Sequence, residues 1–270
     1  MTSTLLVRGI RYALDDIGQG PLILFGHGML FDRTMFHSQA AALSARFRCV
    51  SIDWPGHGKS EFQPEGWTAD DLVEDVAALI GALGERKAIL VGLSQGGAIF
   101  TRFALAYPEL VHALVVMDAT PFGPPVAVGS WLTDASTTLL LGDDIRIEAF
   151  FEDVLERMLS PATRRDHPEV VAAARACLRS HDRSGLARAV RLPLTYGSVV
   201  DRLSSITVPT LIAWGEHDAG SPIELARHYL CAVTGSQFVT FDGAGHSAPL
   251  ETPAAVTAAL DRFLADLRLE

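Results

Sequence analysis

The sequence is poor in cysteine, in basic charge and in long apolar runs. Its three cysteines, Cys49, Cys177 and Cys231, are odd in number and form neither a C-x-x-C pair nor a metal-ligand spacing, so disulfides and a structural zinc site are not expected. Lysine and arginine number 22 against 32 acidic residues, giving a net charge of −10, and no extended basic run occurs. The electrostatic attraction that drives nucleic-acid binding is therefore missing.

The first residues also lack a membrane-directing pattern. Within MTSTLLVRGIRYALDDIG, charges at Arg8, Arg11, Asp15 and Asp16 interrupt the chain before a long apolar run accumulates, so we expect neither a signal peptide nor a membrane span. The sequence predicts a soluble, cytoplasmic protein with no nucleic-acid or membrane partner, and its oligomeric state stays open.

What the chain does have is enough apolar material for a packed core. Apolar residues make up 49% and charged residues 20% of the 270 positions, a balance typical of a globular domain. Short apolar runs alternate with longer helical patterns, which indicates an α/β fold with a mostly parallel sheet. The expected strands are residues 21–25, 47–53, 87–92, 113–118, 208–214 and 237–241, and the expected helices include 69–83, 221–231 and 252–267.

The alternation stops after Asp118, where several prolines break regular structure. Two apolar stripes at helical spacing follow and no strand-like pattern does, so residues 121–200 are expected to be a helical cap inserted in a core made of residues 1–120 and 201–270. The two stripes contain Phe150, Phe151, Val154, Leu155, Met158 and Leu159, and then Val170, Val171, Ala174, Cys177 and Leu178.

The segment Gly92-Leu93-Ser94-Gln95-Gly96 lies between an apolar strand and a helical pattern. A serine on a sharp strand-to-helix turn needs neighbours without a Cβ two residues to either side, and Gly92 and Gly96 meet that need. The pattern therefore predicts a nucleophilic serine at position 94. The alternative is a glycine-rich turn that binds a phosphate.

A nucleophilic serine requires a base and a carboxylate that orients the base. Asp218 and His246 each follow a later strand, giving the chain order Ser, Asp, His. Glu216 and Asp242 compete for the role of the acid, and His217 is the second choice for the base. Asp in such a loop often caps a helix, but the next helix already has its own capping residues in Ser221, Pro222 and Glu224, so we expect Asp218 to be free.

An oxyanion hole needs two backbone amides, and those of Gln95 and Met29 are the candidates. Met29 follows Phe25-Gly26-His27-Gly28, whose glycines let the chain bend toward Ser94. This stretch is no dinucleotide motif, because Phe31 holds the last glycine's position. Residues 53–60 end like a phosphate loop, but Asp53 stands where that motif needs glycine, so a turn is expected.

With these motifs in order, the sequence resembles the α/β-hydrolase superfamily over nearly its whole length. The motifs are H-G, D-x-P-G-x-G-x-S, G-x-S-x-G-G, G-x-x-D and G-x-G-H. The resemblance implies an eight-stranded, mostly parallel sheet with flanking helices, a helical cap after the sixth strand, and a triad of Ser94, Asp218 and His246. Small bacterial esterases, enol-lactonases and cofactor-free haloperoxidases are the most similar groups, although Gln95 stands where many of them have methionine.

The hypothesis is hydrolysis of a carboxylic ester or lactone through an acyl-enzyme, on a small and mostly apolar substrate, without metal or cofactor. Phe31, Trp54, Phe122 and Trp131 are candidate pocket residues. The alternatives are a carbon-carbon bond hydrolase for β-diketones or ring-cleavage products, a perhydrolase or haloperoxidase, and a slow-turnover small-molecule receptor of the same fold.

Overall fold

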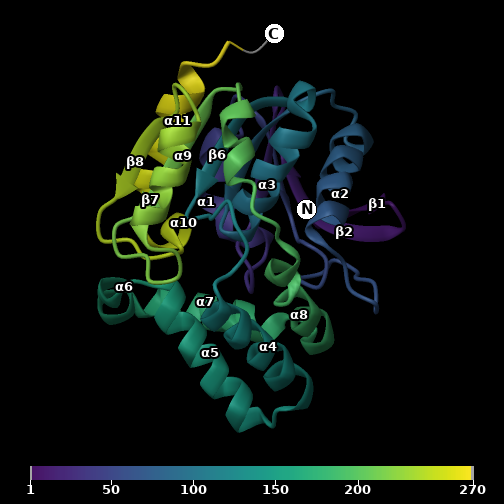
Figure 1. The fold of residues 1–270 in the computed structure, drawn as a ribbon, viewed down its shortest axis with the longest axis vertical. Coiled ribbons are helices and arrows are strands. Elements are labelled where there is room, and N and C mark those ends of the chain that lie inside the picture. Colours follow the sequence, from purple (N-terminus) through teal and green to yellow (C-terminus); the bar gives the residue numbers. More distant parts are fainter. Residues whose placement is uncertain (1, 269–270) are drawn as a thin grey trace.

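The strands of the computed structural model, which describes residues 2–268, form one eight-stranded sheet in the order β1-β2-β4-β3-β5-β6-β7-β8 (Figure 1). β1 and β2 form an antiparallel hairpin, β2 pairs antiparallel with β4, and all other neighbours are parallel. The strands are β1 (Thr2–Val7), β2 (Ile10–Ile17), β3 (Leu22–Gly26), β4 (Arg48–Ile52), β5 (Ala88–Leu93), β6 (Val111–Met117), β7 (Thr210–Gly215) and β8 (Gln237–Phe241). The α/β fold expected from the sequence is confirmed.

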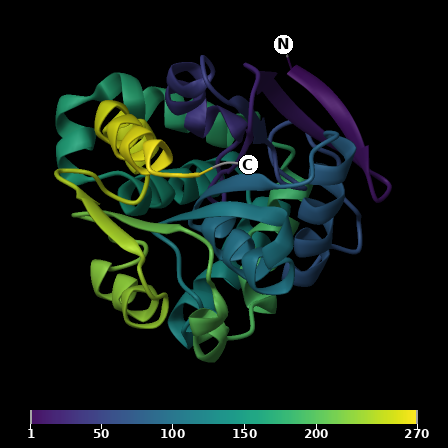
Figure 2. The same ribbon diagram turned by 90° about the horizontal axis from the view of Figure 1, so that it is seen from above.

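Helices cover both faces of this sheet, because β3, β5 and β7 are buried along their whole length and need apolar cover on either side (Figure 2). α1 (His37–Leu43) and α11 (Pro253–Ala265) pack on one face, and α2 (Ala69–Ala82), α3 (Gln95–Ala106) and α9 (Arg227–Ala232) pack on the other. The remaining short helices outside the β6–β7 connection are η1 (Arg33–Phe36), η2 (Pro108–Leu110), η5 (Ile223–Ala226) and α10 (Ala248–Glu251).

The long connection from β6 to β7 is helical, and its part from α4 (Val126–Leu141) to α8 (Arg183–Ala189) lies below the sheet in Figure 1. The buried side chains of its second helix form the apolar stripe that the sequence shows, and include Phe150, Phe151 and Val154. Within the part of the chain that the structure describes, no strand interrupts it. It consists of α4 (Val126–Leu141), α5 (Asp144–Met158), α6 (Pro161–Asp166), α7 (Pro168–Ser180), α8 (Arg183–Ala189), η3 (Leu192–Thr195) and η4 (Val200–Ser205).

The strands expected from the sequence lie within two residues of the observed ones, but the first two strands were not expected. The β1–β2 hairpin is partly exposed and carries charges, so its pattern does not resemble the apolar runs of the buried strands. The helix expected at 221–231 is also different: it begins as the 3₁₀ helix η5, with Pro222 before it and no side-chain cap. None of the described helices is long and apolar enough to cross a membrane.

Candidate active site

Ser94 occupies the sharp turn between β5 and α3, with a φ of +52°. The two glycines around it are required by close backbone contacts. A Cβ on Gly96 would lie 2.0 Å from the carbonyl oxygen of Gly26, and a Cβ on Gly92 would lie 2.4 Å from the carbonyl carbon of Gly96. The turn therefore exists only because both positions lack a side chain, which is the reason the sequence pattern is informative.

His246 and Asp218 form a buried pair at the carboxyl ends of β8 and β7. The Nδ1–H of His246 donates to Oδ2 of Asp218 at 2.8 Å, and the two residues are 4% and 7% exposed. This bond fixes the tautomer and leaves Nε2 of His246 free to take a proton. Burial lowers the pKa of His246, but the charge and hydrogen bond of Asp218 outweigh burial and raise that pKa above 6.5.

Asp218 is not free of the loop in which it lies, so the capping argument made from the sequence is wrong. Its Oδ1 accepts hydrogen bonds from the backbone N–H groups of Gly220 and Ser221, at 2.7 and 2.8 Å, while Ser221 caps no helix with its side chain. One carboxylate oxygen thus holds the loop and the other holds the imidazole. The loop bonds fix the carboxylate and keep Oδ2 directed at His246.

Ser94 and His246 line the same cavity, which has a volume of about 710 Å³ and lies between the strand ends and the helices of the β6–β7 connection. Among the described residues, no hydrogen bond joins the two side chains. Nucleophile and base often close to hydrogen-bond distance only when substrate is bound, so a shared cavity is compatible with the predicted relay. The competing residues Glu216, His217 and Asp242 are exposed. The catalytic roles stay predictions.

Met29 and Gln95, the candidate oxyanion donors, both line this cavity. Gln95 is the first residue of α3, so its N–H is one of the helix's amides that have no acceptor within the helix. The loop carrying Met29 passes close to Ser94, since a Cβ on Gly28 would lie 3.5 Å from that of Ser94. The side-chain amide of Gln95 is buried and makes no hydrogen bond to any described residue.

Two of the four candidate pocket residues line the cavity and two do not. Phe122 and Trp131 are lining residues. Phe31 and Trp54 are core residues, at 2% and 0% exposure, and their assignment to the pocket is wrong. Trp54 donates its Nε1–H to the carbonyl of His27 at 3.0 Å and packs on Phe100, which fixes the ring beneath the loops and away from the cavity.

Sequence reasoning missed Asp118, the residue that directly follows β6. Its Oδ1 accepts from the Gly215 N–H at 2.8 Å, and the side chain is buried beside that of Asp218. Burial, and then the charge of Asp218, raise the pKa of Asp118 well above its usual value. The sequence did contain a signal for this residue. Asp118 and Asp218 both follow apolar strands, and the carboxyl ends of parallel strands lie at the same edge of a sheet.

Asp118, Asp218 and His246 each offer one ligand atom within 4.8 Å of the others, a grouping that could hold a metal ion. The hydrogen bonds favour another use of these atoms. Nδ1 of His246 is bonded to Oδ2 of Asp218, so ligation through these two atoms would break a contact that already satisfies buried polar groups. The arrangement fits a supported imidazole base better than a ligand set.

Comparison with known proteins identifies the family. A sequence profile of the α/β hydrolase fold matches residues 21–253. The chain is 31% identical to 2-(acetamidomethylene)succinate hydrolase of Mesorhizobium japonicum over 204 residues, covering 74% of this chain and 72% of that protein. It is 30% identical to pimeloyl-[acyl-carrier protein] methyl ester esterase of Vibrio cholerae, covering 88% and 91%. A thermophilic esterase of Thermogutta terrifontis superposes with a TM-score of 0.90 at 29% identity, over 98% of both chains.

A mostly parallel sheet with a serine at a strand-to-helix turn defines a hydrolase of the α/β class. This chain belongs to the α/β-hydrolase superfamily.

Proposed function

We propose that this protein is a serine hydrolase that cleaves a carboxylic ester or lactone of a small, mostly apolar substrate through an acyl-enzyme. The observation that carries the proposal is the buried hydrogen bond from His246 Nδ1 to Asp218 Oδ2 beside the cavity that also contains Ser94. It gives the imidazole a fixed tautomer and a raised pKa, as a general base for a serine hydroxyl requires.

In the proposed reaction, Nε2 of His246 takes the proton of Ser94 while Oγ attacks the carbonyl carbon. The N–H groups of Met29 and Gln95 stabilise the negative oxygen of the tetrahedral intermediate. The carbon–oxygen bond to the leaving group breaks, and the leaving oxygen receives the proton from His246. Water, deprotonated by the same histidine, then attacks the acyl-enzyme, releasing the acid and restoring Ser94.

Residues 121–200 form the cap of the proposed substrate pocket, inserted in a core of residues 1–120 and 201–270. Support comes from the cavity, because Trp131, Leu132 and Met158 line it opposite Ser94 and His246. Most of its lining is apolar, which suits an apolar acyl or alcohol group. Trp131→Ala should therefore raise KM for longer-chain p-nitrophenyl esters about tenfold and change p-nitrophenyl acetate turnover little. Equal effects on both esters would contradict the cap assignment.

The relatives support ester chemistry in particular. One of the curated relatives is named as a methyl ester esterase, and the Thermogutta terrifontis structure is that of an esterase. Of the described lysines and arginines, only Arg157 lines the cavity, and Asp153 holds its Nε–H at 2.9 Å. A substrate with one polar or anionic end could place that end at Arg157 and its apolar part between the strand ends and the cap.

The decisive experiment is replacement of the nucleophile. Ser94→Ala should abolish hydrolysis of p-nitrophenyl acetate and labelling by a fluorophosphonate, while Ser205→Ala, at an exposed serine of η4, should behave as the wild type. Near-normal hydrolysis by Ser94→Ala would reject the proposal.

Parallel assays separate the alternative chemistries of the same site. Faster turnover of a β-diketone than of any ester would indicate a carbon-carbon bond hydrolase. Peroxide-dependent halogenation in acetate buffer would indicate a perhydrolase, and labelling of Ser94 without multiple turnovers of any tested substrate would indicate a receptor.

A further inference from the structure

Three buried histidines outside the predicted triad connect the loop that carries Met29 to its surroundings. His27 lies in this loop after β3, His57 lies in the turn after β4, and His181 follows α7. Their rings meet edge to face in sequence, with centroids 5.0 Å apart for His27 and His57 and 5.8 Å apart for His57 and His181. We call these three residues the histidine bracket. Each ring nitrogen in it has a backbone partner.

His27 fixes the peptide that contains the Met29 N–H. The backbone N–H of Trp54 donates to its Nε2 at 3.0 Å, so the proton must be on Nδ1, which donates to the carbonyl of Gly28 at 2.7 Å. That carbonyl and the Met29 N–H belong to the same planar trans peptide and point in opposite directions. The bond therefore directs the Met29 N–H away from the His27 ring.

His57 and His181 hold the next residue from both sides. Leu30 is fully buried and has a φ of +74°, a conformation unfavourable for a side chain with a Cβ. Its N–H donates to Nε2 of His57 at 3.1 Å, and its carbonyl accepts from Nε2–H of His181 at 2.9 Å. Both backbone groups of this strained residue are thus satisfied by imidazoles, and the bond to His57 requires a neutral ring because its Nε2 accepts.

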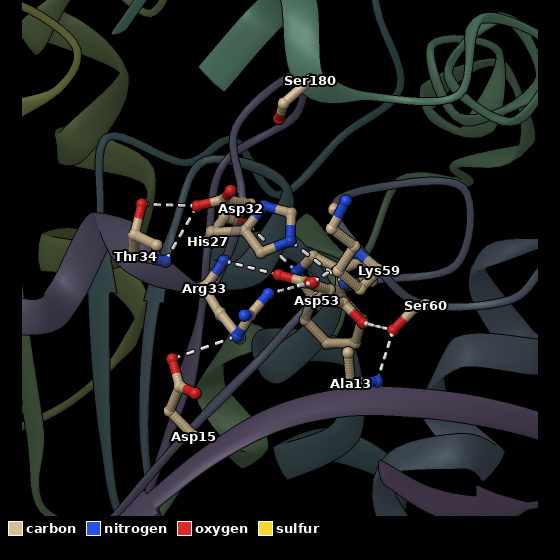
Figure 3. A network of polar contacts seen from close by, with 12 residues as sticks. Ala13, Asp15, His27, Asp32, Arg33, Thr34, Asp53, Lys59, Ser60 and Ser180 are labelled. Carbon is tan, nitrogen blue, oxygen red and sulfur yellow. Dashed lines mark hydrogen bonds and ion pairs between the residues drawn. The ribbon is translucent and has the colours of Figure 1, made fainter. Parts of the chain in front are cut away.

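His181 comes from the helical connection between β6 and β7 and reaches into the core. Its Nδ1 accepts from the N–H of Gly58 at 2.8 Å, which links it to the turn after β4. That turn is itself rigid, because the carboxylate of Asp53 accepts from the backbone N–H groups of Lys59 and Arg33, both at 2.8 Å (Figure 3). Figure 3 also shows Ser180, the neighbour of His181 in the chain, at the edge of this network.

We propose that His181 is a positioning residue for the oxyanion hole: from the cap, and together with His57, it holds Leu30 in its left-handed conformation and so holds the Met29 amide in place. This inference rests on the proposed function, since it assigns a role to the Met29 N–H in acyl transfer. It makes the cap part of the catalytic apparatus as well as a wall of the substrate pocket.

The proposal predicts a particular kinetic signature. His181 is 7% exposed and does not line the substrate cavity, so its loss should leave the binding of a small substrate nearly unchanged. The amide that it positions acts on the oxyanion, which exists only in the transition state and the tetrahedral intermediate. Loss of His181 should therefore lower kcat and leave KM nearly constant.

The test is a series at position 181 assayed with p-nitrophenyl acetate and with a boronic acid that forms a tetrahedral adduct with the serine. His181→Ala should lower kcat about 10- to 100-fold, less than the 10²- to 10³-fold expected when a donor is removed outright, with KM within about twofold. Boronate affinity should fall by a similar factor. His181→Gln, whose amide N–H can reach the Leu30 carbonyl, should recover most of the activity, whereas the shorter His181→Asn should not.

His167→Ala is the matched control, because His167 is an exposed histidine at the other end of α7 whose ring pairs with the exposed Glu169. It should change neither kinetics nor boronate affinity. Thermal unfolding measured on every variant shows whether a loss of activity comes from misfolding. If His181→Ala does not fold, the activities of His181→Gln and His181→Asn test the proposal instead.

Three outcomes would overturn the inference: unchanged kcat in folded His181→Ala, a change confined to KM, or recovery by Asn rather than Gln. Ser94→Ala is assayed in parallel. Turnover by Ser94→Ala would defeat the proposed function itself, whereas an inactive Ser94→Ala beside a fully active His181→Ala would defeat only the role of His181.

Discussion

Four histidines of the described chain are buried, and they fall into two groups with opposite partners. His246 donates to the carboxylate of Asp218, and its pKa is raised in spite of burial. The members of the histidine bracket bond to backbone N–H and carbonyl groups, and burial lowers the pKa of each, that of His27 to about 4. The same side chain therefore becomes a proton acceptor in one place and a fixed neutral link in the other.

The comparison shows that the charge of the partner, and not burial, decides the role. A backbone carbonyl accepts a hydrogen bond without carrying charge, so it orients an imidazole but does little to stabilise an imidazolium in a dry site. A carboxylate does both. The site thus uses neutral histidines where it needs constant geometry and a carboxylate-supported histidine where a proton has to move.

The largest expected effect comes from removing the carboxylate that distinguishes the two groups. Asp218→Asn should lower kcat by about 10⁴ without unfolding the protein, because the imidazole loses its orienting charge and the imidazolium its stabilisation. In the residual activity, the acid limb of kcat/KM should move to lower pH, since only burial and the more distant charges remain to set the pKa of His246.

Asp242→Asn is the matched control, at an exposed aspartate that follows β8. Steady-state kinetics and pH profiles of both variants check the prediction. A loss below tenfold in Asp218→Asn, or a comparable loss in Asp242→Asn, would show that the support of His246 lies elsewhere.

A smaller effect is expected on stability: the histidine bracket and His246 should contribute to the free energy of unfolding with opposite dependence on pH. A histidine with a lowered pKa binds more protons when unfolded, so its contribution to stability is complete above pH 6.5 and falls as pH drops toward the folded value. For His27, with a pKa of about 4, the free energy of unfolding should fall by about 2 kcal/mol between about pH 7 and pH 5. His246 works in the opposite sense: its contribution is present below pH 6.5 and is lost as pH rises through its raised pKa.

Urea unfolding of the wild type and of His27→Gln at both pH values checks this. His27→Gln should be less stable than the wild type at either pH. The fall in its free energy of unfolding from pH 7 to pH 5 should be about 2 kcal/mol smaller than the fall in the wild type. An unchanged difference would mean that His27 is not held neutral. His167→Ala, which replaces an exposed histidine, should keep the wild-type difference.

How much of the fold and of the candidate site could be predicted from the sequence depends on how far apart in the chain the contacting residues lie. The strands and the turn at Ser94 are local, because apolar runs and the two glycines determine them, and the sequence located both. Phe31 and Trp54 were misplaced because aromatic residues in loops beside a site look alike whether they face the cavity or the core. The bond from His181 to Leu30 joins residues 151 positions apart, and no local pattern marks either one.

The smallest expected effect is at Met29, and it depends on the difference between a side chain and a backbone group. The proposed donor is the Met29 N–H, whose direction is set by His27 through the Gly28 carbonyl and not by the methionine side chain. Met29→Ala should therefore change kcat for p-nitrophenyl acetate less than about threefold, with a modest effect on KM because the side chain lines the cavity. A large fall in kcat at constant KM would assign the oxyanion contact to another group, and the histidine bracket would then have no catalytic amide to hold.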